Sequence, residues 1–110
     1  MTVNDILRSL SLSAGSLPDP ERSVTGVYCG DLLSWVMGRA QSGDLWITIM
    51  SNINVVAVAS LADVACVVLA EGAELPPDVL RSAEQKGINV LTSPLPIYET
   101  ALAVSKLLSP

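Results

Sequence analysis

Residues Gly43 to Ala70 read GDLWITIMSNINVVAVASLADVACVVLA, and this pattern predicts the architecture of the chain. An apolar strand over 45–50 leads into a polar elbow over 51–54. An apolar helix over 55–62 and a second apolar strand over 65–70 follow. Strand, helix and strand in this order form a βαβ unit, and continuous apolar strands are typical of parallel sheets covered on both faces.

The helix predicted over 55–62 has no polar face, because Ser60 alone interrupts its apolar side chains. A helix that is apolar all round is normally buried on all sides. It is far shorter than the roughly 20 residues that cross a bilayer. One side can pack on the sheet, so the other side needs a further layer or a second subunit.

A subunit interface is therefore expected near this helix. Trp35 lies just off the buried stripe of its own predicted helix, and it fits either the margin of the core or a contact surface, where Trp is enriched. The candidate interface residues are Trp35, Val55, Val58, Ala59 and Ala62.

The rest of the chain continues the alternation of strands and helices. The other predicted elements are a first helix capped by Thr2 and Asp5, a possible short edge strand over 12–14, a strand over 24–29, a helix from Asp31 to about Ala40, a helix over 78–86 that stops at Gly87, a strand over 88–92 and a last helix after Pro94. Repeated right-handed βαβ units predict an α/β fold of three layers: a mainly parallel sheet of about four core strands with helices on both faces. We expect a single domain over residues 1–110 and the order 2-1-3-4 for the four core strands.

The composition narrows the possible partners. The net charge is −5, and the six Lys and Arg residues are scattered. The sequence therefore argues against nucleic-acid binding, which needs clustered cations, and against anionic membrane surfaces. Half of the residues are hydrophobic and only 15% are charged, which is an apolar excess for a small monomer and favours a homodimer. The segment Met1 to Leu10 lacks the features of a signal peptide, so a cytoplasmic location is expected.

Little in the sequence points to catalysis. The chain contains no histidine, the usual general base, and neither a GxxxxGK[ST] loop nor a GxSxG elbow. Cys29 and Cys66 fit buried free thiols, and no metal site or cofactor is expected. A small enzyme that uses Asp31 is a remote alternative, because helix capping is the simpler role for this residue.

A ligand site is expected beyond the carboxyl ends of the strands, where parallel sheets bind ligands. The elbow is its most suggestive part, because it places polar side chains at a helix start whose free N–H groups favour an anion. The alternative is that these side chains only cap the helix and turn the chain. The candidate ligand-binding residues are Asp31, Ser51, Asn52, Asn54 and Thr92.

Three linked motifs, VTGVYCGDLLS over 24–34, GDLWITI over 43–49 and NVVAVA over 54–59, resemble the DRTGG domain family. The likeness covers nearly the whole chain. It implies an α/β fold, an accessory or regulatory role and frequent dimerisation, with nucleotide binding near such domains in some multidomain relatives. Small members of the family are often labelled as related to the serine kinase that acts on HPr, but the phosphate-binding loop of that kinase has no counterpart here.

The sequence departs from the family pattern in two places. The name-giving motif keeps Arg22, Thr25 and Gly26 but has Val27 where a second glycine is common. Asn52 stands where many small members have histidine, so a function that needs that imidazole is in doubt. The resulting hypotheses are a non-catalytic homodimeric regulatory or interaction module, with a possible protein partner, and a sensor of a small anionic metabolite such as a nucleotide.

Overall fold

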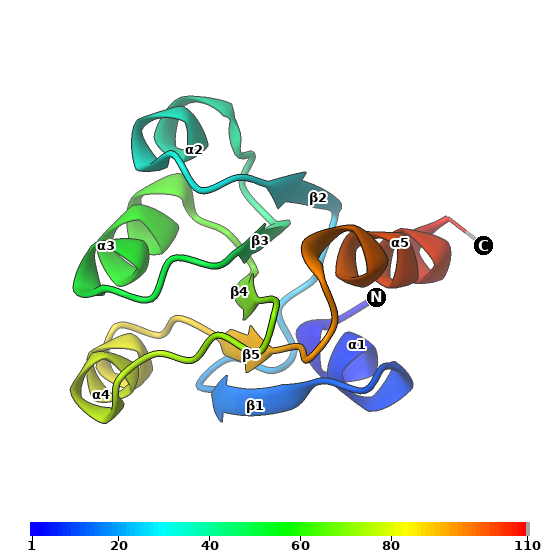
Figure 1. Cartoon of the computed structure of the whole chain (residues 1–110), viewed down its shortest axis with the longest axis horizontal. Helices are drawn as coiled ribbons and strands as arrows, with labels where there is room; N and C mark the ends of the chain where they lie inside the picture. The colour runs from blue at the N-terminus through cyan, green and yellow to red at the C-terminus, as the bar shows by residue number, and fades with distance from the viewer. Residues whose placement is uncertain (110) are drawn as a thin grey trace.

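The computed structural model describes residues 1–109 as a three-layer α/β fold (Figure 1). The elements, in chain order, are α1 (Val3–Ser9), β1 (Ser13–Ser16), β2 (Gly26–Cys29), α2 (Leu33–Arg39), β3 (Asp44–Thr48), α3 (Ile53–Ala62), β4 (Cys66–Leu69), α4 (Pro77–Gln85), β5 (Val90–Thr92) and α5 (Ile97–Leu108). The predicted fold class is confirmed. No helix in the described part of the chain combines the length and apolar character that a membrane crossing needs.

The five strands form one sheet in the order β1-β5-β4-β3-β2. The four core strands β2 to β5 are parallel to one another, and they lie side by side in chain order. The predicted order 2-1-3-4 is therefore wrong. Successive right-handed crossovers between adjacent strands put α2, α3 and α4 on one face of the sheet, as Figure 1 shows, and α1 and α5 cover the other face without any reversal of strand order.

The possible edge strand is present, slightly later in the chain than expected. β1 runs antiparallel to β5, with Ser13 opposite Thr92 and Ala14 opposite Leu91. The register shifts between Ala14 and Ser16, which marks an irregularity in this edge.

The alternation of side chains across the strands divides the core into two clusters. In β3, Trp46 belongs to the cluster under α2, α3 and α4, whereas Leu45 and Ile47 belong to the cluster under α1 and α5. All three side chains are completely buried. Both faces of β3 are thus covered, which explains the continuous apolar run in this strand.

The helix α3 is not buried on all sides within one chain. Its inner side, formed by Val55, Val56, Val58 and Ala59, is buried against the sheet and its neighbouring helices. Its outer side keeps Ile53 and Leu61 exposed, with Ala57 between them at the helical spacing i, i+4, i+8. The expectation of complete burial is therefore corrected: a third layer covers one side of α3 only.

Candidate functional site

The first part of the predicted site lies where β2 and β3 end. The Asp31 carboxylate accepts a hydrogen bond from the Thr48 hydroxyl at 2.7 Å and another from the Ile49 N–H at 3.0 Å. It does not cap α2, whose N-cap is Leu32 and has no side-chain cap bond. The predicted capping role is wrong, because the end of the neighbouring strand offers Asp31 two donors, one of them on a buried threonine.

The elbow between β3 and α3 caps its helix. The Asn52 side chain accepts a hydrogen bond from the Asn54 N–H at 2.9 Å, so the expected capping role is confirmed for Asn52. Ser51, Asn52 and Asn54 are all exposed, and the first turn of α3 carries no acidic side chain. The start of α3 is thus open to solvent and lacks a carboxylate of its own that would repel an anion.

The start of α5, in contrast, is occupied. A carboxylate oxygen of Glu71 accepts a hydrogen bond from the Ile97 N–H at 3.1 Å, and the Glu71 N–H donates to the Leu95 carbonyl at 2.8 Å. The loops after β4 and β5 are therefore joined to each other. An anion approaching the start of α5 would meet the Glu71 carboxylate instead of free N–H groups.

Thr92 lies apart from the other candidate ligand-binding residues. It is on β5, paired with Leu69 of β4 on one side and Ser13 of β1 on the other. Two strands, β4 and β3, separate β5 from β2, which precedes Asp31. The structure brings Asp31 next to the residues that precede the elbow and leaves Thr92 outside that region, because β2 adjoins β3 whereas β5 lies two strands away from β3.

The candidate interface residues divide in a similar way. Trp35 is 52% exposed, and the Arg39 guanidinium lies over its ring at 3.8 Å from the centroid. Val55, Val58 and Ala59 already pack in the core of their own chain, while Ala62 is half-buried. Those three residues are therefore not available at the surface of a single chain, and the exposed apolar part of α3 is the stripe of Ile53, Ala57 and Leu61.

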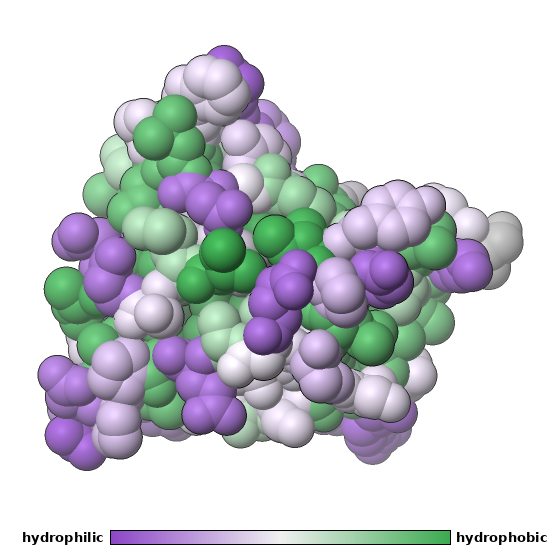
Figure 2. All heavy atoms as spheres, in the orientation of Figure 1, coloured by the Kyte–Doolittle hydropathy of each residue, from purple (hydrophilic) through white to green (hydrophobic). Residues whose placement is uncertain are grey.

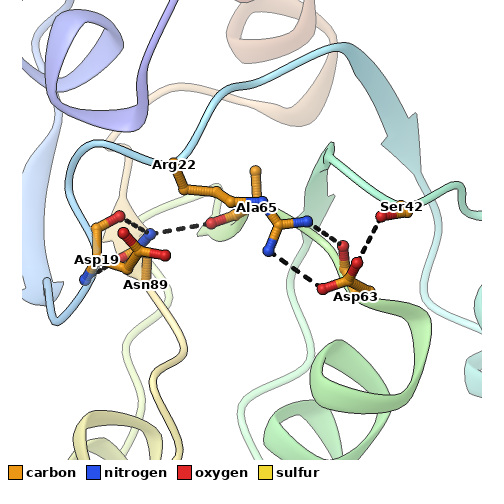
Figure 3. Close-up of polar contacts among 6 residues, drawn as sticks. All are labelled: Asp19, Arg22, Ser42, Asp63, Ala65 and Asn89. Carbon is orange, nitrogen blue, oxygen red and sulfur yellow. Dashed lines mark hydrogen bonds and ion pairs between the residues drawn. The ribbon is translucent and has the colours of Figure 1, made fainter.

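Sequence reasoning missed a polar cluster at the opposite, amino edge of the sheet (Figure 3). Arg22 donates one hydrogen bond to the Asp63 carboxylate at 3.1 Å and another to the Asp63 carbonyl at 2.9 Å. The Ser42 hydroxyl donates to the other carboxylate oxygen. These hydrogen bonds, that of Ser42 foremost, hold the pKa of Asp63 below its usual range.

The position of Asp63 explains why an arginine is placed there. Asp63 is the C-cap of α3 and adopts the left-handed conformation, with φ of 57°. A cation at this position is favoured by the negative end of the helix dipole. One feature of the sequence could have pointed to this cluster, namely the presence of Arg22 in the name-giving motif. The contact with Asp63 gives Arg22 a structural role.

The next two motif residues also serve the fold. Thr25 donates its N–H to the Gly43 carbonyl at 3.0 Å, and a Cβ on Gly43, whose φ is +85°, would lie only 2.5 Å from the Thr25 hydroxyl. A Cβ on Gly26 would lie 2.6 Å from a carboxylate oxygen of the buried Asp44. Through these contacts, Thr25 and Gly26 hold the amino end of β2 against the amino end of β3, at the sheet edge opposite to the elbow.

The two cysteines have different environments. Cys66 is completely buried in β4, and burial raises the pKa of its thiol to about 12. Cys29 is exposed at the end of β2, and partial desolvation together with the nearby Asp31 charge raises its thiol pKa. Both are free thiols, but the expectation that both are buried is wrong for Cys29, which lies at the exposed end of an edge strand. Within residues 1–109, no group of three or more possible metal ligands comes together.

Comparison with known proteins gives two matches in keeping with this geometry. The family model described as "DRTGG domain" matches residues 21–107. The fold is similar to the crystal structure of the CBS and DRTGG domains of the regulatory region of Clostridium perfringens pyrophosphatase, complexed with its activator diadenosine tetraphosphate, with a TM-score of 0.73 and 16% sequence identity. The match covers 94% of this chain but only 45% of that one. No curated protein sequence matches the chain.

Proposed function

Because the chain belongs to the DRTGG domain family, we propose that it is a non-catalytic regulatory or interaction module that works as a homodimer. The regulatory role is supported by the similar fold in the regulatory region of the Clostridium perfringens pyrophosphatase. A non-catalytic role is supported by the hydrogen bonds that Asp31 Oδ1 accepts from the end of β3, which give this residue a structural role, and by the absence of histidine from the sequence. As an interaction module, it would also be suited to a further protein partner.

One observation carries the dimer: large apolar side chains remain on the surface of a small chain. Figure 2 shows hydrophobic residues over α2 and in the middle of the same face, between α3 and α5. Large exposed apolar areas mark interaction sites in soluble proteins. The exposed large apolar residues are Met1, Leu32, Trp35, Met37, Ile49, Ile53, Leu61, Leu95, Tyr98 and Leu102.

Light scattering coupled to size exclusion tests the dimer. At micromolar concentration, we expect twice the mass of the 11.5 kDa chain. Dilution should return the mass of one chain without larger species, which separates a specific dimer from aggregation. A mass of one chain at every concentration up to the solubility limit would overturn the proposal.

A sensor of a small anionic metabolite is the second candidate function. The exposed polar start of α3, with no acidic residue in its first turn, supports it, and diadenosine tetraphosphate is bound in the structure with the similar fold. The net charge of −5 opposes anion binding over the whole surface, so binding at this site would depend on the free N–H groups of α3. This candidate places the ligand against Ser51, Asn52 and Asn54.

A thermal-shift screen tests the sensor with diadenosine tetraphosphate, mononucleotides and acyl phosphates as probes. A probe present at 100 times its Kd should stabilise the fold by about 2.7 kcal/mol. Asn54→Ala should abolish the shift, whereas Gln85→Ala, which removes an exposed amide at the end of α4, should leave it unchanged. The absence of any shift across the panel would contradict the sensor.

A further inference from the structure

The edge strand β2 presents unpaired backbone groups. β2 is the last strand of the sheet and pairs with β3 alone in the described chain. Because the Gly30 N–H donates to the Ile47 carbonyl of β3, the alternation along a strand turns Gly26 and Tyr28 toward β3 and the N–H and C=O groups of Val27 and Cys29 away from it. The free side of β2 thus offers two donors and two acceptors in an extended array.

This edge is short, with four residues, but it lacks the other devices that normally protect a sheet from pairing with another chain. Natural edges also carry charges, proline or bulges. The sequence of β2, Gly26–Cys29, contains neither charge nor proline, and its register with β3 is regular over all four residues. The opposite edge is different, because the register of β1 is broken between Ala14 and Ser16. The difference indicates that β2 is the edge suited to pairing.

Both helices beside β2 expose large apolar side chains. α2 lies on the face of Tyr28, where its residues Leu33 and Val36 join the same core cluster. α5 lies on the other face and packs on β2 and β3. Figure 1 shows β2 between these two helices at one end of the sheet. The exposed residues are Leu32, Trp35 and Met37 at α2, and Tyr98 and Leu102 on α5.

We propose that a second copy of this chain pairs its β2 with this edge, antiparallel across a two-fold axis. The inference rests on the proposed homodimer and identifies its interface. The outward groups match when Val27 lies opposite Val27 of the partner subunit. These two residues then exchange two hydrogen bonds across the axis, and Cys29 faces Thr25 of the partner subunit. The sheets of the two copies become one continuous sheet.

The two-fold axis also accounts for the exposed apolar side chains. An axis perpendicular to the sheet places α2 beside α2 of the second copy on one face, and α5 beside α5 on the other. A standard interface buries about 800 Å² per partner, roughly one seventh of the 5445 Å² surface of this chain. Since β2 is uncharged, self-pairing sets no carboxylates of this acidic chain directly opposite each other within the strands.

A groove beside the amino end of β2 leaves room for the second strand. Its volume is about 390 Å³, and it lies between β2 and the end of α5. The residues that line it are all uncharged: Thr25, Gly26, Val27, Ser105, Leu108 and Ser109. In the proposed register, Cys29 of the partner subunit comes opposite Thr25, next to this groove.

A matched pair of charge substitutions tests the interface. Trp35→Glu places a charge on α2 beside the proposed axis, whereas Leu61→Glu places the same charge on the outer stripe of α3. Both side chains are more than half exposed, so both variants should fold, as circular dichroism can check. Light scattering should give the mass of one chain for Trp35→Glu and of two chains for Leu61→Glu. The reverse result would place the interface on α3 and overturn the inference.

Cross-linking through Cys29 provides a measurement that does not depend on those variants. In the proposed register, four residues separate the two Cys29 positions along the strands, or about 13 Å. A bis-maleimide of that reach should join two chains through Cys29, because Cys66 is completely buried and unreactive in the folded protein. Cys29→Ser should abolish the product, and peptide mass spectrometry should identify a Cys29–Cys29 link.

The homodimer and the β2 pairing would be overturned by different results. A wild-type chain that is monomeric by light scattering would overturn the homodimer itself. A dimer that persists in Trp35→Glu and yields no Cys29–Cys29 link would overturn the β2 pairing and leave the homodimer standing.

Discussion

At the scale of single residues, the name-giving motif of the family has a structural explanation. Arg22 binds both the side chain and the backbone carbonyl of Asp63, and this contact joins the segment before β2 to the end of α3. Gly26 leaves space for the Asp44 carboxylate. These residues lie on the amino edge of the sheet, whereas the elbow lies on the carboxyl edge. The motif therefore supports the fold.

The ion pair predicts a specific pH dependence. Because the folded state lowers the pKa of Asp63, its charge stabilises the fold at pH values above the usual aspartate pKa, and this contribution is lost as the pH falls through the lowered value. The pair is largely exposed, so the effect is at most about 1 kcal/mol. Asp63→Asn, which tolerates the left-handed conformation, should be less stable than wild type near neutral pH.

Urea unfolding of both proteins from about pH 7 to about pH 2 measures this difference. The gap in the free energy of unfolding should narrow as the solution becomes acidic. A gap that stays constant over the whole range would show that the charge of Asp63 does not contribute.

The hydrogen bond between Asp31 and Thr48 should contribute to the stability of the fold. Asp31→Ala should lower the free energy of unfolding by about 1–2 kcal/mol, because the buried Thr48 hydroxyl loses its acceptor. Thr48→Val removes that hydroxyl, so the double variant should cost less than the sum of the single variants. Strictly additive losses in a denaturant-based double-mutant cycle would contradict the contact.

At the scale of elements, α3 combines an apolar sequence with a half-exposed position. Its inner side fills the core cluster under α2, α3 and α4, and its outer side shows Ile53, Ala57 and Leu61 to solvent. Periodicity could not distinguish the two sides, since both are apolar. Its ends are defined more clearly, by Asn52 at the start and Asp63 at the finish.

The cap of α3 should be measurable in the stability of the whole chain. Asn52→Ala removes the acceptor of the Asn54 N–H and should cost about 1 kcal/mol in the free energy of unfolding. Asn52→Ser keeps a good capping group and should restore most of that loss. Equal stability of the alanine variant and wild type in urea unfolding would contradict a capping role for Asn52.

At the scale of the whole molecule, the sheet has a core cluster on each face, and its two edge strands, β1 and β2, differ in the regularity of their register. β3 and β4 lie inside the sheet, and all their side chains are buried. β1 is an edge strand with three exposed residues out of four and an irregular register. The stability of the backbone should therefore vary across the sheet.

Native-state hydrogen exchange should show this gradient. The amides of β3 and β4 should exchange most slowly, because their opening requires loss of both core clusters. The amides of β1 should exchange faster than those of β5, its only neighbour in the sheet. Protection of β1 equal to that of β4 would contradict this distribution of stability.

The sequence by itself determined the features that depend on neighbouring residues. The βαβ unit of residues 43–70 and the caps at Thr2 and Asn52 follow from apolar periodicity and from side chains that bond within a few positions. A short edge strand was also predicted in the loop-rich segment, although its bounds differ by one or two residues and its antiparallel direction came only from the structure.

Only the tertiary structure decided the order of the strands, the exposed side of α3 and the partners of Asp31 and Arg22. Asp31 meets Thr48, 17 positions away, and Arg22 meets Asp63, 41 positions away. No local pattern encodes such contacts, because they arise when packed strands and helices bring distant segments together. The same reason applies to β2: its sequence predicts a strand, but only its place at the end of the sheet leaves its edge free.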